Sequence, residues 1–194
     1  MSEYRIEGFI GEDGATAAAL AAFLSQHEGQ PVRVLVNSPG GDAFEGAAML
    51  AELERHGQAT TVAAGIAASA ASLVLMGGRD IAVHRDAMVM IHDPSGMTFG
   101  TATAHRSTAE TLDKLSATYA RSYARASGQP VARVRAWMAA ETWLDADEAV
   151  ALNFADKIEG GEPVAYARFD PQMFRHPPAA AVARMMAETE GAST

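Results

Sequence analysis

Short apolar runs rich in β-branched residues alternate along this chain with longer segments of helical periodicity. The run PVRVLV at 31–36 is typical of the expected strands, and the segment 101–127 is the longest expected helix. Parallel strands need a long crossover between them, and that crossover is usually a helix. The alternation therefore predicts an α/β domain with a largely parallel sheet.

The expected elements fill most of the chain. Strands are expected at 4–10, 31–36, 59–64, 80–83 and 87–91, and helices at 15–27, 42–55, 69–76, 101–127, 131–140 and 147–153. After about residue 159 the composition changes, and Pro171, Pro177 and Pro178 interrupt any regular pattern. We therefore expect one domain at 1–160, followed by a partly ordered C-terminal tail at 161–194 outside the core.

Composition excludes several classes of function. The chain of 194 residues has no cysteine, which excludes a thiol nucleophile, disulfides and cysteine-bound zinc. Its net charge of -9 argues against nucleic acid as a partner. No apolar run has the length of a membrane span, and the N-terminus MSEYRIEG lacks the layout of a secretion signal. We expect a cytoplasmic protein with no membrane partner.

Ser69 lies in the segment GIAASAAS, between an expected strand and an expected helix. A hydroxyl at a helix start lies beside free backbone N–H groups, which can stabilise the oxyanion of an acyl-transfer intermediate. The small neighbours would let a substrate backbone approach closely. The alternative is that Ser69 only caps the helix, so the chemistry depends on its partners.

Two further turns follow expected strands and supply candidate partners. The loop Asn37–Gly41 has two adjacent glycines, which suit a loop that presents N–H groups to a ligand, although an ordinary turn has the same composition. His92 follows the strand MVMI, at the sheet edge where α/β active sites form, although it could be an interior histidine. The other histidines lack metal-ligand spacing, and we expect no cofactor.

These pieces together resemble a known family. The segments VNSPGGDAFEG, GIAASAAS, MIHDPSG and ETWLDADEAVALNFAD match, in order, motifs of the Clp protease proteolytic subunit. The segments are most similar to those of the Clp-related head-maturation proteases of tailed phages and prophages. The resemblance covers about residues 4–158, and it is the order of the motifs that makes it specific.

The resemblance implies a serine endopeptidase. It assigns the nucleophile to Ser69, the general base to His92 and the oxyanion-hole amides to Gly41 and Ala70. Candidate substrate contacts lie nearby, at Gly40, Asp42 and Pro94. The implied fold is the β/α spiral shared by Clp proteases and crotonases, with a protruding helix at 101–127. The implied assembly is a stack of rings around a proteolytic chamber.

The chain departs from the family pattern at one position. The family's catalytic aspartate lies six residues before an aromatic that aligns with Trp143, and this position is Trp137. An indole cannot orient a histidine as a carboxylate does. Glu141 is our candidate for the third catalytic residue, while Asp145 or a backbone carbonyl could take that role instead. Glu141 could also be an ordinary solvated glutamate.

Three other functions remain open at this point. A Ser–Lys peptidase of the signal-peptide-peptidase type could use Lys114, but that lysine also lies four residues after Glu110, as in a surface ion pair. A crotonase-like acyl-CoA enzyme would leave Ser69 unexplained. An inactive, ring-forming assembly subunit would explain Trp137.

Partners follow from the resemblance and from one helix. Leu112, Leu115, Tyr119 and Tyr123 form an apolar stripe, which suits either an intersubunit contact or packing within the domain. The resemblance favours the intersubunit contact, and it implies homo-oligomeric rings that act on peptides or unfolded proteins. The chain has no GxxxxGK[ST] loop, so ATP-driven unfolding would need a separate ATPase. Capsid proteins are the other candidate partners.

Overall fold

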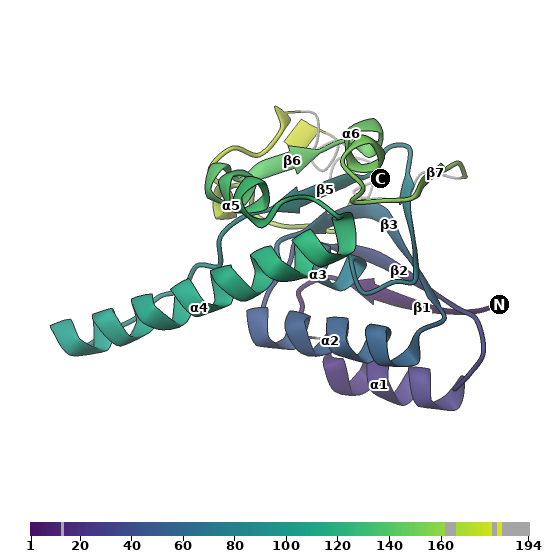
Figure 1. Ribbon diagram of the computed structural model, residues 1–194, viewed down its shortest axis with the longest axis horizontal. Helices are drawn as coiled ribbons and strands as arrows, with labels where there is room; N and C mark the ends of the chain where they lie inside the picture. The colour runs from purple at the N-terminus through teal and green to yellow at the C-terminus, as the bar shows by residue number, and fades with distance from the viewer. Residues whose placement is uncertain (13, 162–165, 180–181, 184–194) are drawn as a thin grey trace, which may run out of the picture.

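The computed structural model describes residues 1–12, 14–161, 166–179 and 182–183 (Figure 1). Its strands are β1 (Ser2–Glu7), β2 (Val32–Ser38), β3 (Ala59–Ala68), β4 (Asp80–His84), β5 (Met88–Ile91), β6 (Thr142–Leu144) and β7 (Lys157–Glu159). Its helices are α1 (Ala17–Gln26), α2 (Ala43–His56), α3 (Ala70–Leu75), α4 (Ala102–Ser127), α5 (Val131–Ala140) and α6 (Ala146–Ala151), followed by the short 3₁₀ turn η1 (Pro171–Met173). The predicted α/β class is confirmed.

The strands form one sheet, which is parallel at every pairing except that of β5 with β6. Five of the strands lie side by side in the order β1-β2-β3-β4-β7. Strand β5 also pairs with β3, and β6 pairs with β5. The sequence analysis missed β6 and β7, because strands of three residues are too short to show an alternating pattern.

Strand β3 changes partners along its length. Residues 60–63 pair with β4, and residues 66–68 pair with β5. The change occurs around Gly65, where a β-carbon would lie 2.6 Å from the Oδ1 atom of Asn37. That Oδ1 atom accepts a hydrogen bond from the Ile66 N–H at 3.1 Å, beside a bulge between β2 and β3. The second half of β3 is thus directed towards β5 and the site described below.

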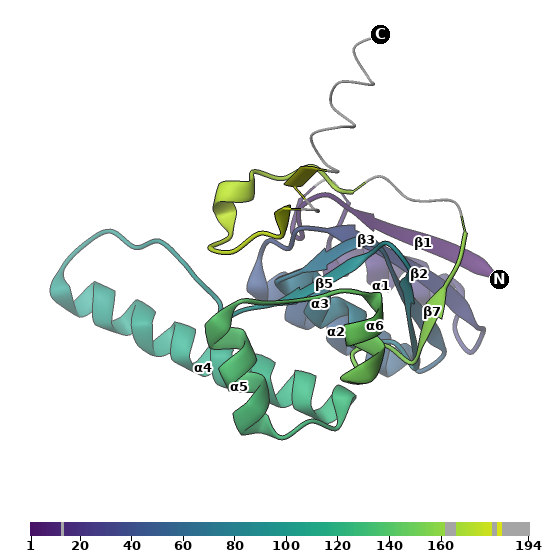
Figure 2. The ribbon, with the colours of Figure 1, turned by 90° about the horizontal axis from the view of Figure 1, so that it is seen from above.

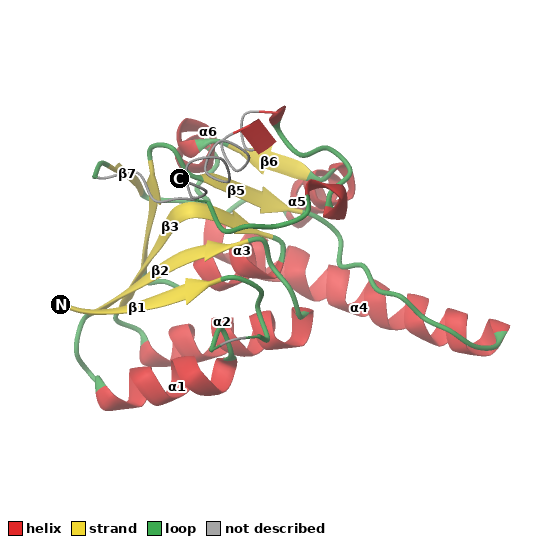
Figure 3. Cartoon of the chain, turned by 180° about the vertical axis from the view of Figure 1, so that it is seen from behind, coloured by secondary structure: helices red, strands yellow, loops and turns green. Residues whose placement is uncertain are grey.

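The two faces of the sheet are covered differently. Helices α1 and α2 lie side by side against one face, with α3 between them and α4 (Figures 1 and 3). The other face carries a smaller apolar cluster, in which residues of β3 and β5 contact the chain after β7. Its members are Ile66, Ala68, Met90, Ala167, Phe169 and Phe174, with Trp143 packed against them. The domain boundary at residue 160 stays a prediction, but part of the chain beyond it packs on the sheet.

Asp42 caps α2 by accepting hydrogen bonds from the N–H groups of Phe44 and Glu45. The carboxylate of Glu45 does not return to its own helix start. It accepts a hydrogen bond from the Ala17 N–H at 2.8 Å, at the first turn of α1. One acidic side chain therefore ties the starts of the two helices together.

Helix α4 projects well beyond the rest of the molecule; the chain after β5 runs outwards to the far end of this projection, where α4 begins and returns to the body (Figure 2). The apolar stripe on this helix divides in two. Tyr119 and Tyr123 are buried in the main core, so the prediction of an exposed interface stripe is wrong for them. Leu112 and Leu115 are half-buried and face a cleft. Among the described helices, none is long and apolar enough to cross a bilayer.

The close contact between α2 and α3 depends on Gly46. A β-carbon at this position would lie 2.9 Å from the β-carbon of Ala70. In an open helical position, Gly→Ala raises the free energy of unfolding by about 1 kcal/mol, whereas overpacking a core lowers it by about 1–3 kcal/mol. We expect Gly46→Ala to lower the free energy of unfolding measured by urea denaturation.

Ala48 lies on the exposed face of the same helix and provides the matched control. Ala48→Gly should lower the free energy of unfolding by about 1 kcal/mol, through helix propensity alone. A stabilising effect of Gly46→Ala would show that α2 and α3 are not in close contact.

Candidate active site

Three strand ends meet at one edge of the sheet. The chain leaves β2 into the loop Pro39–Gly41, leaves β3 at Ser69, and leaves β5 at His92. Because β2, β3 and β5 are parallel neighbours, their carboxyl ends come to the same edge. The three segments that the sequence analysis singled out are thus brought together.

Ser69 has an uncommon backbone conformation, with φ 56° and ψ -125°. This conformation lies outside the regions that side chains with a β-carbon usually adopt, and such strain persists only where neighbouring contacts enforce it. The Ser69 N–H donates to the carbonyl of Met90 at 3.0 Å, which ties the turn to β5. Its side chain makes no capping hydrogen bond to α3, so the helix-cap interpretation of Ser69 is wrong.

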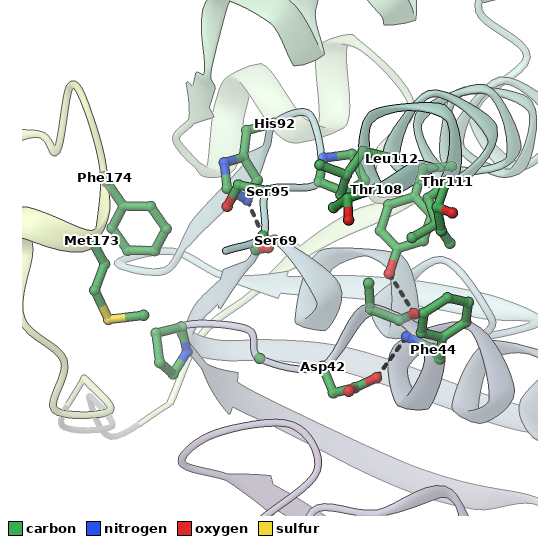
Figure 4. A pocket seen from close by; sticks show the side chains of 17 residues that line it. Asp42, Phe44, Ser69, His92, Ser95, Thr108, Thr111, Leu112, Met173 and Phe174 are labelled. Carbon is green, nitrogen blue, oxygen red and sulfur yellow. Dashed lines mark hydrogen bonds between the residues drawn. The ribbon is translucent and has the colours of Figure 1, made fainter. Parts of the chain in front are cut away.

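The hydroxyl of Ser69 is directed towards His92 (Figure 4). Its Oγ atom lies 2.7 Å from the Nε2 atom of His92, which is hydrogen-bond distance. In the tautomer with an unprotonated Nε2, the serine hydroxyl donates to the ring. The pair therefore has the geometry in which a histidine can remove the serine proton.

His92 is held mostly in its neutral form by its surroundings. Burial lowers the pKa of the imidazole below its usual value, because a charged ring is poorly solvated there. The positive charge of Arg175 also lowers that pKa, while the carboxylates of Glu141 and Asp93 raise it. Burial is the largest of these effects, so His92 is neutral near pH 7 and able to accept a proton.

Glu141 is buried beside the site, but its hydrogen bonds go elsewhere. Its carboxylate accepts from the N–H groups of Arg175 at 2.9 Å and His176 at 2.7 Å, and from the indole of Trp143 at 3.5 Å. Burial alone would raise the pKa of Glu141, but these hydrogen bonds hold it below its usual value. Among the described residues, no hydrogen bond joins Glu141 to His92. Its effect on the ring is electrostatic.

Asp145 and Trp137, the other positions considered in the search for a third catalytic residue, make their contacts with residues other than His92. Asp145 is exposed and caps α6, where it accepts from the Glu148 N–H at 2.8 Å. The ring of Trp137 packs edge-on against Phe154, and the guanidinium of Arg133 lies 4.8 Å from the centre of that ring. The indole is therefore part of the packing around α5.

The glycine loop lies directly against Ser69. A β-carbon at Gly40 would lie 2.6 Å from the Ser69 β-carbon, so the close approach needs glycine. The Gly40 N–H donates a hydrogen bond to the Ser38 hydroxyl, and the Gly40 carbonyl accepts one from the Ile10 N–H. Gly40 does not line the cleft, so its contact with a substrate stays a prediction. Within the described chain, the Gly41 N–H has no hydrogen-bond acceptor. Ala70 is the first residue of α3, so its N–H has no acceptor within the helix.

A cleft of about 400 Å³ opens over the Ser69–His92 pair. Asp42 and Pro94 line it, and their contact with a substrate stays a prediction. Its remaining walls come from the start of α2, from α4 and from the chain after β7, and they are largely apolar. They include Phe44, Thr108, Thr111, Leu112, Leu115, Tyr119, Met173 and Phe174 (Figure 4). Lys114 is exposed on α4 and does not line this cleft.

Several residues near the site were missed by sequence reasoning. Met173 and Phe174 come from the segment that was expected to lie outside the core. Ser116 donates to the Asp93 carboxylate at 2.5 Å and so ties the residue after His92 to α4. The sequence offered no signal for the position of Met173 and Phe174 at the cleft or for the Ser116–Asp93 hydrogen bond. Each brings together residues that are far apart in the chain and share no motif.

Comparison with known proteins agrees with this geometry. A model of the family described as "Clp protease" matches residues 11–162. The chain is 31% identical to the ATP-dependent Clp protease proteolytic subunit 2 of Bacillus licheniformis, over 70% of this chain and 74% of that protein. The chain is 30% identical to the ATP-dependent Clp protease proteolytic subunit of Oltmannsiellopsis viridis, over 69% of this chain and 70% of that protein. It is 28% identical to the proteolytic subunit of Chlorella vulgaris, over 69% of this chain and 68% of that protein. The chain therefore belongs to the Clp protease family, and it is a peptidase of the serine type.

Proposed function

We propose that this protein is an endopeptidase that cleaves peptide bonds by acyl transfer to Ser69, with His92 as the general base. The observation that carries the proposal is the 2.7 Å distance between Ser69 Oγ and His92 Nε2, at a strained turn on the floor of an open cleft. A serine is a weak nucleophile unless a neighbouring base takes its proton. This pair meets that requirement.

The steps follow from the positions of these groups. His92 Nε2 takes the hydroxyl proton as Ser69 Oγ bonds to the peptide carbonyl carbon, and the carbonyl oxygen becomes an oxyanion. The free N–H groups of Gly41 and Ala70 are suited to donate to that oxygen. His92 then gives its proton to the leaving amine, the C–N bond breaks, and water releases the acyl group by the same steps.

We propose that Glu141 supports this cycle through its charge. Its carboxylate is ionised and close enough to raise the pKa of His92. A nearby negative charge stabilises the imidazolium that forms when Ser69 loses its proton. This role does not require the direct hydrogen bond of a Ser–His–Asp triad.

The cleft supports an extended peptide as the substrate. Its apolar walls suit apolar side chains, while its open mouth suits a chain that continues in both directions. We propose that the protein acts in the cytoplasm on unfolded segments, delivered by a separate ATPase or by capsid assembly. The support for a phage capsid substrate is the resemblance of the motifs at 36–46, 65–72 and 90–96 to head-maturation proteases.

Ser69→Ala removes the nucleophile without adding bulk or charge. We expect kcat/KM for a fluorogenic peptide to fall by about 10⁴-fold or more, since removing a triad serine leaves only binding and oxyanion stabilisation. Ser95→Ala is the matched control, because Ser95 is an exposed serine of the same cleft. Its kcat/KM should stay within about twofold. Equal losses in the two variants would refute the assignment of Ser69.

The pH profile tests His92. Only the neutral imidazole accepts a proton, so kcat/KM should fall as the ring becomes charged on acidification. Because burial lowers the pKa of His92, the midpoint of this acidic limb should lie below about 6.5, the value of an unperturbed histidine. Lys114→Ala should leave the profile unchanged. A profile that rises only between about pH 8 and 10 would point to a lysine base instead.

We also propose that the chain assembles into rings that stack through the projecting end of α4. Met97 and Phe99, beside that end, are 83% and 86% exposed, and large exposed apolar side chains favour contact with a partner. Sedimentation velocity should therefore show an oligomer. Phe99→Asp should reduce it to single rings or smaller species.

Val131→Asp is the control for this test, since Val131 is an exposed apolar residue away from the projection. It should leave the sedimentation profile unchanged. A chain that stays monomeric at every concentration while fully active would contradict the ring. An unchanged profile for Phe99→Asp would exclude this contact between rings.

A further inference from the structure

The segment 166–176, which we call the C-terminal strap, crosses the face of the sheet opposite α1 and α2 (Figure 1). It lies beyond residues 11–162, which the family model matches. Three of its side chains are buried in the cluster on that face. These are Ala167, Phe169 and Phe174, which pack with Ile66, Ala68, Met90 and Trp143. The strap is therefore part of the packed structure around the site.

The first half of the strap is fixed to the strands. The Tyr166 hydroxyl donates to the carbonyl of Asp86 at 2.5 Å. The Ala167 N–H donates to the Oδ1 atom of Asn37 at 3.0 Å. The same oxygen accepts from Ile66, at the point where β3 turns towards β5. A single buried amide thus connects the strap to the strand that ends at Ser69.

The second half is fixed by Glu141. Both of its carboxylate oxygens accept hydrogen bonds from consecutive backbone N–H groups, those of Arg175 and His176. The Glu141 side chain is only 2% exposed, and burying a carboxylate is costly unless such hydrogen bonds compensate for the lost water. Glu141 is therefore accommodated only when the strap is in place.

Between these anchors, the strap reaches the catalytic cleft. The 3₁₀ turn η1 directs Met173 into the cleft, where the residue is 49% exposed (Figure 4). Phe174 is buried, and its ring lies edge-on to that of His92, with 6.1 Å between the ring centres. Figure 4 shows these two residues on one side of the Ser69–His92 pair, and Phe44 and Leu112 on the other.

We propose that the C-terminal strap is a working part of the catalytic cleft, in which Met173 and Phe174 form the wall beside His92 and select an apolar substrate side chain. Glu141 is the residue that positions this wall. The proposal rests on the proposed peptidase function of Ser69 and His92. A substrate bound at Ser69 would pass between the strap and α4, so the two walls would contact opposite sides of the cleaved bond.

A charge placed on this wall tests the proposal. Met173→Glu introduces a carboxylate into the cleft at an exposed position, where the fold should tolerate it. The measurement is kcat/KM for two sets of peptides that differ at one residue near the cleaved bond, leucine in one set and lysine in the other. We expect the leucine-to-lysine ratio to fall by about tenfold or more, since pocket contacts of this kind set selectivity.

Gln172→Glu is the matched control. It places the same charge on the neighbouring residue, which is exposed and does not line the cleft. Its leucine-to-lysine ratio should stay within about twofold of the original value. If the leucine-to-lysine ratio of Met173→Glu also stays within about twofold of the original value, the strap is not a wall of the substrate site and the proposal is overturned.

A second measurement keeps this proposal separate from the proposed function. In the full-length Ser69→Ala protein, nuclear magnetic resonance should show cross-peaks between the ring protons of His92 and Phe174, whether or not the protein cleaves peptides. If the unmodified protein cleaves no peptide, the peptidase function is refuted. Cross-peaks observed in that case would still show that the strap lies against His92. Their absence would show that the strap does not lie against His92, and would overturn the proposal itself.

Discussion

The strained turn at Ser69 is the constraint on which the site depends. With φ 56° the residue occupies a conformation that costs about 1–3 kcal/mol, and the surrounding contacts must hold it there. Its N–H is bonded to Met90 of β5. Gly40 lies so close that no side chain could be accommodated. The sheet and the glycine loop therefore enforce together a conformation that directs the serine hydroxyl towards His92.

Buried hydrogen bonds from α4 also hold the turn at Ser69 in place. The Tyr123 hydroxyl lies 2.8 Å from the Ser72 hydroxyl and donates to the Ser69 carbonyl at 3.3 Å. Burial raises the pKa of Tyr123, so its hydroxyl stays protonated and able to donate. These contacts explain why the stripe on α4 is only partly a surface feature. Its inner end supports the turn at Ser69, and its outer end lines the cleft.

Sequence reasoning succeeded where a short motif carries both a local structure and a chemical group. Ser69, His92 and the glycine loop each follow a strand directly, so the parallel topology alone brings them to one edge. It failed where the outcome depends on packing between distant segments. The buried tyrosines of α4 appear in the sequence only as helical spacing, which cannot distinguish a core from an interface.

The surroundings of Glu141 show the same limit. Its pairing with Arg175 and His176 joins residues 34 and 35 positions apart, in a segment whose prolines suggested a loose tail. Nothing in the local pattern of Met173 or Phe174 indicates that they reach the cleft. Trp137 was recognised from the sequence as a departure from the family. Only the structure shows that its ring packs against Phe154 and Arg133.

The most direct test of the central claim is chemical labelling of the proposed nucleophile, Ser69. The purified full-length chain would be treated with a fluorophosphonate, digested, and mapped by tandem mass spectrometry. Because the hydroxyl of Ser69 lies against an unprotonated imidazole in an open cleft, we expect a single modified residue, Ser69, and loss of labelling when His92 is replaced by alanine. Labelling at another serine, or labelling at Ser69 that persists without His92, would contradict the assignment of this pair.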